Sequence, residues 1–240
     1  MNNEGRSSHA CSDAILSTLD RRPNFGIILL GTGLRISLGN RGRVGVNVQV
    51  RGKATHSSTP GAGLSAIEGA YEVLNRLKQV PLEGTHPLLG DRHAIAYQIV
   101  FEPLAPHTLP EVARIRVDRR LLTGDDPEKA ATDIRETIGD LSPYQVDVER
   151  GNFMLPALVH PNNSGVRALK QAHRHVRGID PETIYGQGTF DAGGPCAAGV
   201  PTVMYGVGGG ASLLGEDFAP ISGVVDEART ITHTVLAFLS

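Results

Sequence analysis

The stretch Gly42–Leu77, GRVGVNVQVRGKATHSSTPGAGLSAIEGAYEVLNRL, decides the fold of this 240-residue chain. Valines at 44, 46, 48 and 50 alternate with small or polar residues. A period of two with β-branched side chains predicts a strand that is covered on one face. A polar turn follows at 54–60, and a hydroxyl within 57–59 is expected to cap the next helix. That helix is predicted over 63–78, where apolar residues recur at helical spacing: Ile67, Ala70, Leu74 and Leu77.

The residues that follow predict three more strands and a second helix. An apolar run at 94–101, an alternation of apolar and charged residues at 113–118, and Val146 with Val148 each predict a strand. Asp126-Pro127-Glu128 is typical of a helix start, because it combines a capping carboxylate with a proline in the first turn. Residues 41–150 therefore predict the order β-α-β-β-α-β, an open-faced sandwich with two helices on one face of a sheet.

The flanking segments, 1–40 and 151–240, predict a separate α/β layer into which this sandwich is inserted. The first segment contains a short helix near 8–20 and a continuous apolar run at 25–30, which is expected to be a buried strand. The second contains a helix near 164–177, a buried strand at 200–205 and a last helix at 224–239. The apolar stripe expected on that last helix consists of Val225, Ala228, Ile231, Val235 and Leu239.

Composition excludes several classes of function. The chain carries 23 Lys and Arg against 25 Asp and Glu, so it lacks the basic face of a protein that grips nucleic acid. No apolar run approaches the roughly 20 residues of a membrane helix. The N-terminus shows no signal peptide, so a cytoplasmic location is expected. Cys11 and Cys196 lie far apart in the sequence, and we expect free thiols.

Several segments could carry chemistry, and each also has a purely structural interpretation. His56 stands in the exposed polar turn, where it either donates to an anion or bonds its neighbours. The glycine-rich loop at 186–194 either presents backbone N–H groups to a carboxylate or is a connection capped by Asp191. His173 and His175 lie two apart on a helix, on different faces, and are expected to be solvated. Among the arginines at 114, 116, 119 and 120, most are expected to be solvated, while one could clamp a carboxylate.

Taken together, three separated motifs resemble the family of dinuclear-zinc aminoacylases, acetylornithine deacetylases, succinyl-diaminopimelate desuccinylases and carboxypeptidases G. Gly42–Leu77 is similar to that family's lid, or dimerisation, domain, with its G-x-x-x-H-S-S-x-P turn. His107-Thr108-Leu109-Pro110-Glu111 through Asp118-Arg119-Arg120 is similar to the family's N-x-x-P…D-x-R. Gly188-Thr189-Phe190-Asp191-Ala192, followed by the segment at 198–206, is the third match.

The resemblance implies a partial catalytic α/β layer with an inserted dimerisation domain, and hydrolysis of an amide next to a carboxylate. In this family two zinc ions activate water and a glutamate is the general base. His56 matches the lid histidine that supports the oxyanion. Arg120, Gly188 and Thr189 match contacts to the substrate carboxylate, and His107 stands where an asparagine usually helps to bind substrate. A homodimer through residues 41–150 is also implied, with an N-acyl amino acid or another small carboxylate as ligand.

The departures from the family concern the metal ligands. The first histidine and the bridging aspartate would lie upstream of residue 1, so the chain is expected to be truncated. Whether that segment is lost or precedes a misplaced start stays open. Asn2-Asn3-Glu4-Gly5-Arg6 carries amides where the resemblance implies glutamates. Leu30 and Leu213 stand where it implies a glutamate and a histidine.

A hydrocarbon side chain cannot ligate zinc, so the chain as it stands is expected to lack a metal cofactor. The sequence therefore favours a pseudoenzyme that binds a carboxylate or dimerises without catalysing hydrolysis. The alternative is an active zinc-dependent acylase, deacetylase or carboxypeptidase whose metal site is rebuilt from other residues or another chain. A remnant with no selected activity is a third possibility.

Overall fold

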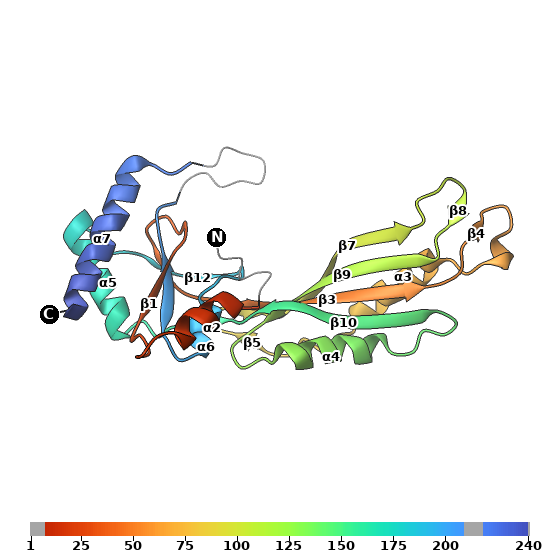
Figure 1. Cartoon of the computed structure of the whole chain (residues 1–240), viewed down its shortest axis with the longest axis horizontal. Helices are drawn as coiled ribbons and strands as arrows, with labels where there is room; N and C mark the ends of the chain where they lie inside the picture. Colours follow the sequence, from red (N-terminus) through yellow and green to blue (C-terminus); the bar gives the residue numbers. More distant parts are fainter. Residues whose placement is uncertain (1–7, 209–217, 240) are drawn as a thin grey trace. The chain divides into compact units, whose positions relative to one another are not determined.

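The computed structural model describes residues 8–208 and 218–239 and divides into two compact units. The insert unit is Arg43–Phe153, and the layer unit combines Met1–Gly42 with Met154–Ser240. Each unit contains its own sheet (Figure 1). Each also has its own apolar core. The predicted fold class, an α/β layer with an inserted open-faced sandwich, is confirmed.

The sheet of the insert unit has four strands in the order β10-β3-β9-β7. These strands are β3 (Gly42–Arg51), β7 (Ala94–Glu102), β9 (Val112–Leu121) and β10 (Gln145–Met154). The helices are α3 (Ala66–Leu77) and α4 (Pro127–Ile138). Short pairs complete the unit: β4 (Thr55–His56) with β8 (Thr108–Leu109), and β5 (Thr85–His86) with β6 (Gly90–Asp91).

One apolar core joins the sheet to both helices. The valines at 46, 48 and 50 on β3 are at most 1% exposed, and they share this core with residues of β9, α3 and α4. The alternation in the sequence therefore predicted the covered face correctly. Ile67 is an exception, because it is 46% exposed while Val73 takes a buried place on α3. The predicted stripe was wrong at that residue.

The predictions of the N-cap residues of α4 and α3 had different outcomes. Asp126 caps α4 as predicted, since its Oδ1 accepts a hydrogen bond from the Glu128 N–H at 2.9 Å. The expected cap for α3 was wrong: Ser65 is the N-cap, and its Oγ accepts from the Ile67 N–H at 3.3 Å. Residues 57–59 precede instead a 3₁₀ turn, Pro60–Ala62, which separates the polar turn from the helix.

The layer unit contains a mixed sheet in the order β1-β13-β2-β11, with β12 also paired to β2. Its strands are β1 (Gly26–Leu29), β2 (Ile36–Asn40), β11 (Ala157–Leu158), β12 (Thr183–Gly186) and β13 (Thr202–Tyr205). The strand β1 runs parallel to β13. Its helices are α2 (Ala10–Ser17), α5 (Ser164–Arg177), α6 (Gly193–Ala197) and α7 (Ile221–Leu239).

Two expectations about burial in the layer unit were wrong. The strand β1 forms where predicted, but it is an edge strand and Leu29 is 60% exposed. On α7, Gly223, Thr230 and Thr234 are the buried residues, while four of the five predicted stripe residues are exposed. Threonine is tolerated there because Thr234 Oγ1 donates to the Thr230 carbonyl within the helix. None of the helices within the described residues is both long and apolar enough to cross a membrane.

Candidate functional site

The polar turn of the insert unit brings two histidines together that are distant in the sequence. The strands β4 and β8 pair antiparallel, with His56 opposite Thr108, and they lie side by side at one end of the unit (Figure 1). The ring centroids of His56 and His107 are 6.0 Å apart. The Ser57 N–H donates to the His107 carbonyl at 2.7 Å, which ties the two loops at this point. We call these two residues the histidine pair.

The hydrogen bonds of His56 fix its tautomer. The backbone N–H of Ser58 donates to His56 Nδ1 at 3.2 Å, and Ser58 Oγ lies 2.8 Å from the same nitrogen. A backbone N–H can only donate, so Nδ1 is an acceptor and the proton of the neutral ring is on Nε2. His56 is exposed. It therefore presents an N–H donor to its surroundings, which suits an anion or a developing oxyanion.

Arg120 lies away from the histidine pair within the same unit. It is near the far end of β9, eight residues beyond Val112, which is about 26 Å along a strand. Its Nε is 2.8 Å from Asp118 Oδ1 in an ion pair that is mostly buried. The insert unit by itself thus does not bring Arg120 to the histidines.

Gly188 and Thr189 belong to the layer unit, in the loop between β12 and α6. A Cβ at position 188 would lie 3.1 Å from Cζ of Phe190, so a larger residue would press on that ring. The N-cap of α6 is Ala192, whose side chain makes no capping hydrogen bond.

Zinc-dependent hydrolysis requires side chains that can ligate the metal. Leu30 follows β1, the strand that runs parallel to β13, and its side chain offers no electron pair. Near the end of β13, the Glu227 carboxylate is already engaged, since it accepts from the Val207 N–H at 2.7 Å. Within residues 8–208 and 218–239, no three His, Cys, Asp or Glu side chains gather to hold a metal ion. These residues do not fit a zinc site by themselves. The segments at 2–6 and Leu213 lie outside the described residues.

The sequence interpretation missed a buried histidine. His173 was expected to be solvated, but it is 1% exposed, and its Nδ1 lies 2.8 Å from the Tyr205 hydroxyl. Its Nε2 is buried without a hydrogen-bond partner. Burial, followed by the nearby Arg177 guanidinium, lowers the pKa of His173 below its usual value. The helix pattern places residue 173 with Val166 and Leu169 on the face toward the core, which was the signal that could have identified it.

The lowered pKa of His173 makes the free energy of unfolding depend on pH. Because His173 binds a proton less readily when folded, the unfolded chain takes up more protons below its ordinary pKa of about 6.5. The free energy of unfolding should therefore fall as the pH falls below that value. Urea unfolding of His173→Gln should show a flatter pH dependence than the unchanged chain, whereas the exposed His175→Gln should keep it. Equal pH dependence in all three proteins would contradict the assignment.

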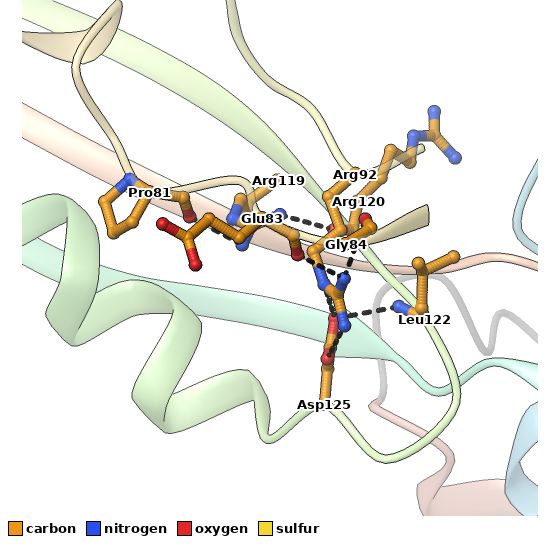
Figure 2. Close-up of polar contacts among 8 residues, drawn as sticks. All are labelled: Pro81, Glu83, Gly84, Arg92, Arg119, Arg120, Leu122 and Asp125. Carbon is orange, nitrogen blue, oxygen red and sulfur yellow. Dashed lines mark hydrogen bonds and ion pairs between the residues drawn. The ribbon is translucent and has the colours of Figure 1, made fainter. Parts of the chain in front are cut away.

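A second polar network lies in the insert unit, near the start of α4 (Figure 2). Arg92 donates from Nε and Nη2 to the two carboxylate oxygens of Asp125, at 2.8 and 2.7 Å. Its Nη1 donates to the carbonyls of Glu83 and Gly84. Burial raises the pKa of Asp125, but the hydrogen bonds from Arg92 and the Leu122 N–H outweigh it, and the pKa lies below its usual value. Arg119, one of the four arginines of which most were expected to be solvated, is 4% exposed beside this pair.

Comparison with known proteins agrees with the arrangement of the insert unit. Residues 38–145 match the peptidase dimerisation domain family. The uncharacterized protein YgeY of Escherichia coli K12 is 24% identical, over 82% of this chain and 53% of its own length. The chain thus spans about half the length of the curated relatives it matches.

Solved structures share the fold of both units. The aminopeptidase PepT from Bacillus cereus matches with a TM-score of 0.73 and 20% identity, over 96% of this chain and 61% of that one. Human carnosine dipeptidase 1 matches with a TM-score of 0.67 and 15% identity, over the same two shares. At such identities these likenesses show the fold alone. Residues 38–145 belong to the peptidase dimerisation domain family, and these matches are consistent with the metallopeptidase family that the motifs of the chain resemble.

Proposed function

We propose that this chain binds a small ligand with a carboxylate, such as an N-acyl amino acid or a peptide, and does not hydrolyse it as it stands. The observation that carries the proposal is a contrast between two kinds of position. Leu30 and Leu213 occupy places where the family resemblance implies zinc ligands. His56, by contrast, is present and is held with an N–H donor facing outward.

The side chains present favour ligand binding without catalysis. Zinc needs three or four His, Cys or carboxylate ligands, and it is the zinc that lowers the pKa of water to about 7. A single oxyanion donor contributes only about 3–4 kcal/mol. His56 alone therefore cannot replace the metal, but one N–H donor is sufficient to help bind an anion. In the proposal, the histidine pair, Arg120, Gly188 and Thr189 contribute to ligand binding.

The test is ligand binding by the whole chain, measured by calorimetry with N-acetyl amino acids and dipeptides. His56→Ala should weaken binding about tenfold or more, since a hydrogen bond to a charged group is worth roughly 1.5–3 kcal/mol. His160→Ala is the matched control, because His160 is also exposed and its Nδ1 also accepts a backbone N–H. Equal affinities for the two variants would remove His56 from the site.

The proposal includes a homodimer through the insert unit. The strand β7 is at one edge of the four-stranded sheet and exposes Ile95, Tyr97 and Val100. The neighbouring helix α3 exposes Tyr71, which is 64% accessible. The opposite edge strand, β10, carries only polar or charged residues at its exposed positions, among them Asp147, Glu149 and Arg150. An apolar edge with unpaired backbone groups is suited to pairing with a second copy.

An alternative is an active metal-dependent amidohydrolase whose metal site is completed by other residues or another polypeptide. The outward N–H of His56 favours it, because this is the donor geometry that an oxyanion requires. Relatives of the same fold are named as aminopeptidase and dipeptidase, so peptides would be the substrates to try. Zinc-dependent turnover separates this alternative from the proposal.

A further inference from the structure

A guanidinium occupies a position in the insert unit where the strand pattern calls for a hydrocarbon. On β9, Ala113, Ile115 and Val117 point into the core, and residue 119 continues the same alternation. Arg119 is nevertheless only 4% exposed. A charged side chain at such a position is costly unless something compensates its charge.

The described part of the chain supplies Arg119 with carbonyls but with no carboxylate within ion-pair distance. Its Nη1 donates to the Arg120 carbonyl at 2.9 Å, and its Nη2 reaches the Pro81 carbonyl at 3.4 Å (Figure 2). Its Nε is buried without a hydrogen-bond partner. Desolvation by burial, the largest influence, lowers the pKa of Arg119. The fold thus holds a buried cation whose hydrogen-bonding capacity is incompletely used.

A cavity of about 400 Å³ lies beside this cation. Arg119, Arg92 and Pro81 line it together with the first turn of α4. The helix is 12 residues long, and its N-terminus carries a partial positive charge from the backbone dipoles. Two independent features therefore favour an anion at this place: a buried guanidinium and a helix N-terminus.

Most of the carboxylates that line the cavity already have a hydrogen-bond or ion-pair partner. Asp125 is bound by Arg92 and by the Leu122 N–H, and Asp126 accepts the capping hydrogen bond from Glu128 N–H. Asp133 is paired with Lys129 Nζ at 2.9 Å. Glu83 is exposed and has no such partner among the described residues. Because four carboxylates surround the cavity, a singly charged ligand is favoured over a dianion such as phosphate.

We propose that this cavity, which we call the Arg119 cavity, is a binding site for a small monovalent carboxylate. The ligand's oxygens would face Arg119 and the backbone N–H of Lys129, because Pro127 has no N–H and the N–H groups of Glu128 and Ala130 are bound by Asp126. The site is separate from the histidine pair, so it is a second anion site in the insert unit and does not depend on the proposed function.

Acetate is the probe that tests the proposal, with binding followed by backbone amide chemical shifts of the whole chain. Saturable shifts are expected at residues 128–130 and 119. Arg119→Met should weaken acetate binding about tenfold or more, while Arg116→Met, an exposed arginine on the same strand, should leave it unchanged. The methionine variant should fold, because replacing a buried charge by a hydrocarbon of similar length is often neutral or stabilising.

A second variant keeps the proposal testable if Arg119→Met does not fold. Glu83→Gln removes the exposed carboxylate at the cavity and should tighten acetate binding by about two- to fivefold. His56→Ala should bind acetate at the Arg119 cavity as the unchanged chain does, which separates this site from the proposed function. Three results would overturn the proposal: equal acetate affinity in the two arginine variants, weaker binding in Glu83→Gln, or tighter Arg119-dependent binding of inorganic phosphate than of acetate.

Discussion

A variant with Tyr97→Lys and Val100→Lys should sediment as a monomer at concentrations where we expect the unchanged chain to be a dimer. Both residues are exposed on β7, the apolar edge strand of the insert unit, at 58% and 39%. In a symmetric dimer each lysine would meet its own counterpart or the same apolar surface, so two charges per chain would be desolvated. Lysine on an edge strand is also a common means of preventing pairing. We expect the dimer dissociation constant to rise about 100-fold or more, equivalent to roughly 2.7 kcal/mol.

The opposite edge of the same sheet provides the matched control. Gln145→Lys with Glu149→Lys places two lysines at exposed positions of β10. This variant should sediment as the unchanged chain does. If the β10 variant dissociates and the β7 variant does not, the dimer uses the other edge. If the unchanged chain stays monomeric at high concentration, the proposed dimer is wrong.

Sequence periodicity predicted the main strands and both helices of the insert unit, because burial on one face leaves a regular pattern. In the layer unit it predicted β1, β13 and three helices but missed β2, β11, β12 and α6. The valines of β3 and the cap at Asp126 follow directly from the period of a strand and from the free N–H groups of a helix. Periodicity was less informative about which face of a helix is covered. Ile67 is exposed on α3, and α7 packs through Thr230 and Thr234, because close packing can favour small residues over large ones.

The candidate site was only partly predictable. The polar turn around His56 could be identified as exposed, and the pairing of β4 with β8 then brought His107 to it. That pairing depends on contacts between segments distant in the sequence, which local pattern does not encode. Buried polar residues were missed for a different reason, because residue type was taken as the guide to burial. His173 lies on the inward face of the helix α5, and Arg119 continues the inward alternation of the strand β9. Their position in the pattern is the better guide to burial.

The largest expected effect concerns the rate of amide hydrolysis. A zinc-dependent hydrolase needs an activated water, and Leu30 and Leu213 cannot ligate the metal that supplies it. The difference between a metal-activated water and one supported by a single N–H donor amounts to many orders of magnitude in rate. The proposal therefore expects no turnover that depends on zinc, even when zinc is supplied, although ligand binding remains.

The most direct measurement is the release of free amino acid from N-acetyl amino acids and dipeptides by the purified whole chain, with zinc content determined on the same sample. Our account predicts no release above the rate without protein, and the same result for His56→Ala. Zinc bound at about two ions per chain, with turnover that a chelator abolishes and that His56→Ala strongly reduces, would contradict it.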